Sequence, residues 1–359
     1  MSLNLFDVPG INYRYEAKWW IPFKPANMGR RPILFTVPLS DDYIDLNETK
    51  LEVKLRMNTA GTNGLSADET GASDGNSTKY VAHSLFNQMN VSFNVVLMTE
   101  QSNAYHQKAY LETLQNYNRQ GETTLASQGW VNELNVRDSF TPTNAANSDT
   151  PNPNNWSGKT GHKALTSRLL GKGYHTFMIE PHIAVFRRGK CLVSGVQIDL
   201  ELYLNDNTMF LFGTPDTTTS VNKKIPTLGD NDLFVTLWMK KVTLNASVYA
   251  RLQKERTFSK TKKVQHPVVR SEIRTYSFDG NSTRWEQDNV FLNKIPIKVI
   301  IGLIHSTNYN GSLQHYPYAY EKFRVTRVRQ TIDGEEYPYR ALELQAILPQ
   351  KIWSGMTAS

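Results

Sequence analysis

The stretch VQIDLELYLN, residues 196–205, alternates apolar and polar side chains along its whole length. The stretch LEVKLRM, residues 51–57, repeats the pattern. A period of two places successive side chains on opposite faces of an extended backbone, so both stretches are predicted to be β-strands with one buried face. Further strand candidates occur at residues 91–97, 177–186 and 233–242.

Later stretches add strands, and helical signals are few. Residues 295–304 are apolar almost throughout, which predicts a strand covered on both faces. Residues 323–327 begin another strand, which Asp333-Gly334 would turn into a hairpin. The best helical pattern is SNAYHQKAYLETLQNY, residues 102–117, and residues 246–255 form a second, shorter candidate.

Long polar stretches rich in Gly, Asn, Thr and Ser separate the strands, at residues 59–79, 139–161 and 214–231. They contain too few apolar side chains to fold by themselves, so we expect loops. Loops of this length inside a domain are uncommon and usually functional. Many short strands joined by long polar loops predict an all-β sandwich of jelly-roll type.

The composition is that of a folded, mildly basic protein. The 359 residues include 40 Lys and Arg against 33 Asp and Glu, a net charge of +7, which permits contact with polyanions without requiring it. Aromatic residues make up 11% of the chain, which argues against intrinsic disorder. The single cysteine, Cys191, excludes an internal disulfide framework. We find no apolar run of the roughly 20 residues that span a bilayer, and no secretory signal in residues 1–20.

A basic stretch divides the chain. Residues 251–264, RLQKERTFSKTKKV, are predicted to be a linker, and HPVVRSEIRTYSF after them is typical of a fresh first strand. We therefore predict an N-terminal arm at 1–31, a first jelly roll with long loops at 32–250, and a second, truncated jelly roll at 265–359.

The basic residues of the linker region form a candidate polyanion-facing surface, although such charge runs are also typical of solvated linkers. The candidate residues are Arg251, Lys254, Arg256, Lys260, Lys262, Lys263, Arg270 and Arg274.

Motifs for catalysis are not found. The sequence has no phosphate-binding loop, dinucleotide fingerprint or nucleophile elbow. His175 and His182 flank a predicted strand with Glu180 between them, a spacing too weak to predict a metal site. Cys191 follows basic residues 187–190, which would lower the pKa of its thiol, yet no histidine in a recognisable context supports a nucleophile. We predict no enzyme, no catalytic or cofactor-binding residue and no metal ligand.

Three blocks in order resemble a known family. They are HSLFNQMNVSFNVVLMTEQSNAYHQKAYLETLQNY at 83–117, LFVTLWMKKVTLNASVYA at 233–250 and DNVFLNKIPIKVIIGLIHSTNYNGSLQHYPYAYEKFRV at 288–325. Together they resemble the double jelly-roll major capsid proteins of Polinton-like and adintovirus-type DNA viruses, which include integrated copies in animal genomes.

The resemblance implies two jelly rolls in tandem, a homotrimer with a pseudo-hexameric outline, and an icosahedral shell around a DNA genome. It implies a location in the virion capsid, assembly in the host nucleus or cytoplasm, and no cofactor or small-molecule substrate. Partners would be other copies, a minor or penton capsid protein, and packaged DNA or an internal membrane. The family's second roll continues beyond the segment matching Arg340, so we expect this roll to be incomplete or completed by another chain.

Two alternatives remain open at this stage. A minor, vertex-type capsid protein would have a single jelly roll. A β-sandwich that binds carbohydrate or another ligand would use loop tryptophans, for which Trp130, Trp156 and Trp285 are candidates. An enzyme ranks third, because it would need a constellation of residues that only the fold can bring together.

Overall fold

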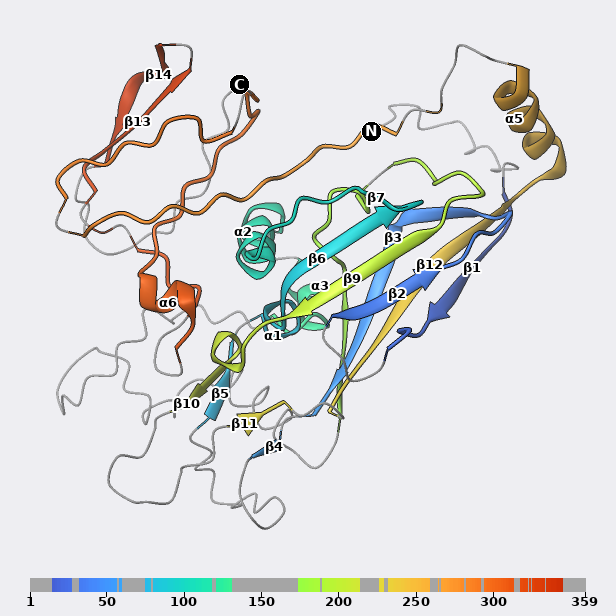
Figure 1. Cartoon of the computed structure of the whole chain (residues 1–359), viewed down its shortest axis with the longest axis horizontal. Helices are drawn as coiled ribbons and strands as arrows, with labels where there is room; N and C mark the ends of the chain where they lie inside the picture. Colours follow the sequence, from blue (N-terminus) through green and yellow to red (C-terminus); the bar gives the residue numbers. More distant parts are fainter. Residues whose placement is uncertain are drawn as a thin grey trace, which may run out of the picture.

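The computed structural model shows a β-sandwich followed by an extended segment (Figure 1). It describes residues 15–27, 32–56, 58–59, 75–78, 80–117, 121–130, 174–187, 189–213, 226–228, 232–258, 264, 266–280, 282–291, 294–312, 317–321, 323, 325–332 and 334–344.

Strands dominate this part of the chain. The strands are β1 (Tyr15–Phe23), β2 (Ile33–Val37), β3 (Tyr43–Leu55), β4 (Asn58–Thr59), β5 (Gly75–Ser77), β6 (Phe86–Phe93), β7 (Val96–Leu97), β8 (His175–Ile179), β9 (Ile198–Leu204), β10 (Leu211–Gly213), β11 (Pro226–Thr227), β12 (Leu233–Leu244), β13 (Arg327–Ile332) and β14 (Glu335–Glu343). The helices are α1 (Val81–Ser84), α2 (Tyr105–Asn116), α3 (Glu122–Ala126), the 3₁₀ turn η3 (Asn207–Met209), α5 (Ala246–Phe258) and α6 (Ser306–Asn310).

The topology of the two large sheets identifies the fold. One sheet has the order β1-β12-β3-β8 and the other the order β2-β9-β6-β7, with every pair antiparallel. Counted along the chain, the first of these eight strands pairs with the last, the second with the seventh, the third with the sixth and the fourth with the fifth. This is one long hairpin wrapped into two packed sheets, which is a jelly roll. The predicted all-β jelly-roll fold is confirmed.

The core lies between the two sheets and follows the period of two. Leu51 and Val53 of β3 point inward from one sheet, and Ile198 and Leu200 of β9 from the other, all essentially without solvent exposure. The register pairs Val53 with Val235 of β12 on one side and with Phe177 of β8 on the other. Because the inward positions of all these strands match, one apolar layer fills the sandwich.

Several sequence-based predictions are confirmed and others differ. The first strand predicted for HPVVRSEIRTYSF is not formed at 266–278, and the strand predicted at 177–186 ends at Ile179. The two helix candidates form α2 and α5, and the hairpin predicted at Asp333-Gly334 joins β13 to β14. Residues 294–303, by contrast, form no regular strand, and Ile295 and Ile297 are 73% and 95% exposed. An apolar segment becomes a buried strand only when neighbouring strands cover it, and none of the described residues does so here.

The boundaries of the first roll differ from the predicted ones at its N-terminal edge. β1 lies within the predicted arm, residues 1–31, yet it pairs with β12 along its length and belongs to the sheet. At the other end, α5 leaves the sandwich directly after β12 (Figure 1). In the described residues after α5, regular structure consists of α6 and the β13–β14 hairpin, so the second jelly roll stays a prediction.

The β6–β7 turn carries backbone strain. Asn94 and Val95 have φ angles of 47° and 74°, the left-handed values that a two-residue type I′ hairpin turn requires. Asparagine tolerates this region, whereas a β-branched valine does not. Val95 is 88% exposed and therefore gains little from packing in return.

We predict that Val95→Gly stabilises the protein by about 1 kcal/mol, because glycine adopts this φ without a clash and Asn-Gly is a preferred type I′ pair. The free energy of unfolding in urea measures the effect. Val96→Gly, one residue further along in β7, serves as the matched control and should destabilise. A loss of stability in Val95→Gly would contradict the strained turn.

Candidate functional site

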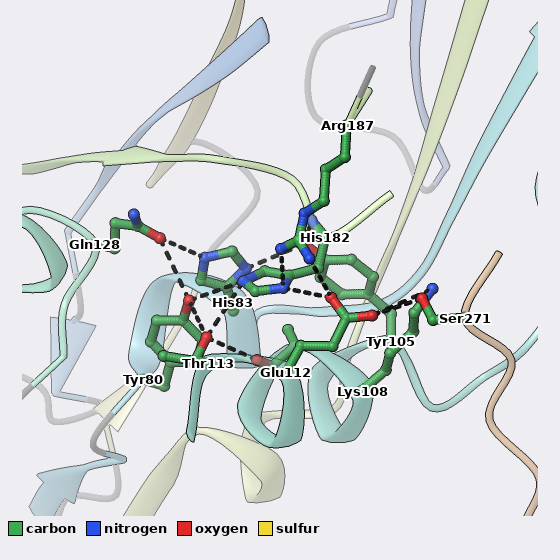
Figure 2. Close-up of polar contacts among 11 residues, drawn as sticks. Tyr80, His83, Tyr105, Lys108, Glu112, Thr113, Gln128, His182, Arg187 and Ser271 are labelled. Carbon is green, nitrogen blue, oxygen red and sulfur yellow. Dashed lines mark hydrogen bonds and ion pairs between the residues drawn. The ribbon is translucent and has the colours of Figure 1, made fainter. Parts of the chain in front are cut away.

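A buried group of polar side chains lies beneath α2, and we call it the polar cluster (Figure 2). α2 presents one face to it, because Tyr105, Ala109 and Thr113 recur every four residues along the helix and are all buried. α1 and the segment after β8 approach from the other side. The members are Tyr80, His83, Tyr105, Lys108, Glu112, Thr113, Gln128, His182 and Arg187.

Glu112 is the centre of charge in the polar cluster. Its Oε2 accepts a hydrogen bond from Nδ1 of His182 at 2.8 Å and contacts Nη1 of Arg187 at 2.9 Å. Its Oε1 accepts from the hydroxyl of Ser271 at 2.6 Å, and Nζ of Lys108 lies 3.9 Å away. Burial alone would raise the pKa of this carboxyl, but the hydrogen bond from His182, the charge of Lys108 and the bond from Ser271 lower it to about 2.

Two histidines of the polar cluster are held in the neutral form. His83 donates from Nε2 to Oε1 of Gln128 and accepts at Nδ1 from the hydroxyl of Tyr105, each at 3.0 Å. Nδ1 of His182 lies 2.8 Å from Oε2 of Glu112 and 2.6 Å from Nη2 of Arg187, and its Nε2 lies 3.2 Å from the hydroxyl of Tyr80. Burial lowers the pKa of both rings, since a charged imidazole would lose its hydration.

The order Glu112–His182–Thr113 has the residue types of a hydrolytic triad, but its geometry serves packing. The hydroxyl of Thr113 lies 3.3 Å from Nε2 of His182 and donates its proton to the carbonyl of Ala109 at 2.8 Å. Thr113 and His182 are 1% and 3% exposed, so a substrate would have to displace α2 to reach them. A nucleophile needs its proton directed to the base and an open approach. This arrangement instead fastens α2 to the roll.

α2 also receives the chain that follows α5. Ser271 binds Glu112, and Nη2 of Arg274 lies 2.8 Å from Oε1 of Glu100, just before the helix. Glu272, between them, pairs with Arg274 and Lys294. These contacts anchor residues 271–274 beside the polar cluster.

A second attachment lies on another face of α2, and we call it the clasp: Ser84, Gln107, Tyr110 and Trp130. It holds residues 317–320, whose Tyr318 is fully buried. The ring of Tyr318 stacks on that of Tyr110 at 4.4 Å with an interplanar angle of 10°. Hence α2 connects the first roll to two segments, residues 271–274 and 317–320, which lie more than 150 residues after α2 in the sequence.

The described members of the predicted polyanion-facing set belong to two segments. Arg251, Lys254 and Arg256 are exposed on α5, with Arg251 paired to Glu255. Arg270 and Arg274 belong to the segment that reaches α2, where Arg274 pairs with Glu100. The remaining candidates lie outside the described residues: Lys260, Lys262 and Lys263.

The described residues also bear on three further features: a metal site, the reactivity of the Cys191 thiol, and a membrane-spanning helix. Within them, no group of three or more His, Cys, Asp or Glu side chains is placed to hold a metal ion. The ring of His175 packs against Phe177, while His182 is engaged by Glu112. Burial raises the pKa of the Cys191 thiol, so the prediction that basic neighbours would lower it is wrong. No helix in this part of the chain has the length and apolarity needed to cross a membrane.

The tryptophans suggested for ligand stacking have different environments. Trp130 packs inside, against Tyr80 and Tyr110 at 5.3 and 5.6 Å between ring centroids. Trp285 is exposed beside two other aromatic rings, and Trp156 lies outside the described residues. Only Trp285 therefore stays a candidate among the described tryptophans of this set.

Sequence reasoning did not find the polar cluster or the clasp. Glu112, His182 and Tyr318 are far apart in the chain and match no motif. One usable signal was present: the run YPYAY at residues 316–320 concentrates aromatic side chains in a stretch with no predicted strand.

Comparisons with known proteins place the chain near viral structures and a nematode protein. No family model matches. "Uncharacterized protein F54H12.2" of Caenorhabditis elegans is 22% identical over 272 residues, covering 74% of this chain and 56% of that protein.

Two solved structures are similar. The crystal structure of PBCV-1 VP54, fitted into a cryo-EM reconstruction of the virophage Sputnik, matches with a TM-score of 0.40, 14% identity, and 68% and 46% coverage of this chain and that one. The cryo-EM structure of the Sputnik virophage matches with a TM-score of 0.43, 11% identity, and 68% and 51% coverage. The chain spans about half the length of the proteins it matches.

We predict that the free energy of unfolding falls as the pH drops below about 6.5. Burial lowers the folded-state pKa of His83, His182 and His106, the last to about 4. The unfolded chain then binds protons that the folded chain does not, so stability is full above about pH 6.5 and declines toward pH 4, by up to about 1.4 kcal/mol per pH unit for each histidine. Glu112 adds nothing in this window, because its folded pKa is depressed and its contribution is lost only below about pH 4.5. Urea unfolding at pH 7, 6 and 5 measures the slope.

His106→Leu tests the assignment to buried histidines. Nε2 of His106 has no hydrogen-bond partner among the described residues, and Asn205 keeps its bond to the carbonyl of Ser84 when the ring is lost. We expect a slope shallower by about one proton. His305→Leu, at an exposed position, is the control and should leave the slope unchanged. Equal slopes in all three proteins would refute the assignment.

Proposed function

We propose that this chain is a structural, non-catalytic capsid protein related to the double jelly-roll coat proteins of Polinton-like DNA viruses. Three copies would form a pseudo-hexagonal capsomer, and capsomers would tile an icosahedral shell around a DNA genome in the virion. The observation that carries the proposal is a complete jelly roll followed by a segment that exposes its apolar side chains.

The jelly roll is necessary to this proposal but does not suffice. Viral coat proteins, lectins and cupins all use sandwiches of this architecture. Function has to be argued from surfaces and sites, because one fold serves many roles. In this chain the most chemically suggestive group, the polar cluster, is closed under α2 and serves as a fastener.

The segment after α5 carries surface that a soluble monomer rarely shows. Ile295, Ile297 and Ile301 are 73%, 95% and 62% exposed within seven residues of chain. Contiguous exposed apolar side chains are typical of surfaces that another protein covers. The β13–β14 hairpin adds a two-stranded ladder, which is marginal by itself in water. Both features favour completion by further strands in an assembly.

The blocks that carry the family resemblance also meet in space. The block at 83–117 contains β6 and α2, and the block at 288–325 contains Tyr318, which stacks on Tyr110 of α2. Two stretches about 200 residues apart in sequence thus form one contact. This contact supports a junction between a first and a second unit in the proposed capsid protein.

The inner wall of the proposed shell would present α5. Arg251, Lys254 and Arg256 are exposed there and would face packaged DNA or an internal membrane. A minor or penton protein would close the vertices of the shell.

A carbohydrate-binding role is the second candidate, because one observation favours it. Trp285 is 47% exposed, with Tyr276 and Phe278 at 6.0 and 5.8 Å between ring centroids. Clustered exposed aromatic rings offer flat apolar surface for stacking. A glycan-binding protein of this kind would bind without forming trimers, so the oligomeric state separates the two candidates.

We expect the purified chain to form trimers, at three times the 40.9 kDa of one chain, with a hexagonal outline. Light scattering gives the mass, and negative-stain imaging gives the outline. A uniform monomer that binds glycan would overturn the capsid proposal and favour the second candidate. A uniform monomer without glycan binding would overturn both.

The exposed isoleucines should drive this association. Ile297→Asp places a charge in the covered surface of the assembly, and burying an unpaired carboxylate is strongly unfavourable. We expect the trimer dissociation constant to rise at least tenfold by light scattering over a concentration series, with unchanged circular dichroism. Gln287→Asp introduces the same charge at an exposed polar position and is the control. Equal association of the two variants would contradict the role of these side chains.

A further inference from the structure

The clasp binds its occupant through two tyrosines of a short turn, in which the backbone N–H of Tyr320 donates to the carbonyl of Tyr318 at 3.0 Å. The hydroxyl of Tyr318 lies 2.6 Å from Oγ of Ser84 in α1, with the ring flat on Tyr110. The second ring, Tyr320, lies 6.1 Å from Tyr110 with an interplanar angle of 17°. The turn brings both rings to Tyr110, and each lies nearly parallel to that ring.

Gln107 forms hydrogen bonds with both the backbone of the segment and the hydroxyl of Tyr320. Its side-chain Nε2 donates to the carbonyl of Pro317 at 2.8 Å, and its Oε1 accepts from the hydroxyl of Tyr320. Gln107 is only 2% exposed, and both ends of its amide are satisfied by the segment. A buried amide left without partners is costly, so the site discriminates for a ligand that supplies both.

The small residue between the tyrosines adds a further requirement. Ala319 is 2% exposed and packs in the same cluster as Tyr110 and Tyr318. A larger side chain at that position would clash with the side chains packed around Ala319. The ligand that fits is therefore a Pro-Tyr-Ala-Tyr segment folded into this turn.

The chain before this segment also touches the first roll at Gly311, which lies close against Thr208 and Met209 of η3. The isoleucines further upstream are exposed, and β13 and β14 after the segment pair with one another. The backbone of Glu321 bonds to Leu303, and Ile304 bridges Tyr320, so the exposed stretch is joined to the anchor itself. Residues 317–320 supply the most deeply buried part of this attachment.

We propose that the clasp is a peptide-binding site for Pro-Tyr-Ala-Tyr, and that in the associated protein it takes residues 317–320 of a second copy of this chain. Each contact is made by residues 317–320 alone, so the same contacts form whichever copy supplies them. Exchange of an identical element between copies is a low-cost route to association. It brings the exposed isoleucines joined to the anchor onto the neighbouring copy, where they are covered. This inference concerns self-association and does not require a shell.

The first test uses a fluorescein-labelled peptide, SLQHYPYAYEKF, with the sequence of residues 312–323. The receptor is the Tyr318→Ala chain, which has lost its own anchor and leaves the clasp vacant. Anisotropy should report saturable binding, and adding Gln107→Leu should weaken it at least tenfold. Gln253→Leu on α5 is the matched control and should have no effect. A peptide with alanine at the position of Tyr318 should not bind.

The second test distinguishes exchange between copies from closure within one chain. Tyr318→Ala retains the clasp without the anchor, and Gln107→Leu/Tyr110→Ala retains the anchor without the clasp. Neither should associate alone, but an equimolar mixture should form mixed complexes by light scattering, since each contributes the part the other lacks. A mixture that stays monomeric while the peptide binds would overturn the exchange.

A folding control keeps the first test decisive. If Tyr318→Ala loses its circular dichroism signal, excess peptide is added to the wild-type chain, and limited proteolysis follows the displaced segment. Faster cleavage within residues 294–312 supports the site, whereas unchanged cleavage, or no anisotropy change with a folded receptor, overturns it. Peptide binding is independent of trimer shape, so a failure of the capsid proposal leaves this readout intact.

Discussion

The pairing of β1 with β12 is the constraint on which the first roll depends. β12 lies between β1 and β3, so the first strand of the chain enters the sheet only through a strand more than 200 residues later. The other pairings nest inside this one, and the core between the sheets closes when the outermost pair forms. Contacts of such high sequence separation fold slowly, because the loop entropy is lost before the contacts form.

The polar cluster gives α2 a defined place on this roll. An apolar helix face could slide or rotate against a sheet at small cost, whereas a carboxylate surrounded by His182, Arg187 and Ser271 tolerates one arrangement. Buried charge adds less to stability than its contacts suggest, because each ion loses its hydration, but removal of one partner is costly. A helix fixed in this way keeps Gln107 and Tyr110 in register for residues 317–320. The cluster thus acts on the clasp through the rigidity of α2.

The period of two was enough to predict β3, β9 and β12, because a sandwich buries one face of each, but it did not reveal β1 or β2. Val53 and Leu200 could be assigned to a core without any knowledge of their partners. The order of pairing was not predictable, since alternation says which face is buried and not which strand lies beside it. Residues 294–303 illustrate the limit, because the same apolar run is a strand only when neighbours cover it. For Cys191 the sequence showed the nearby charges and not the burial that outweighs them. The polar cluster depends on tertiary neighbours from four separate segments.

The segment after α5 combines a buried anchor with exposed apolar side chains, and these two properties explain one another. Tyr318 is buried as deeply as any core residue, while Ile297, some twenty residues earlier, is almost fully exposed. A segment that folded by itself would bury both, and an unstructured tail would bury neither. A deeply seated anchor beside uncovered apolar surface is the arrangement expected of a unit that is first positioned and then covered. The partners of the anchor, Ser84, Gln107 and Tyr110, all belong to or border the first roll. The described residues of one chain supply no surface that covers the isoleucines.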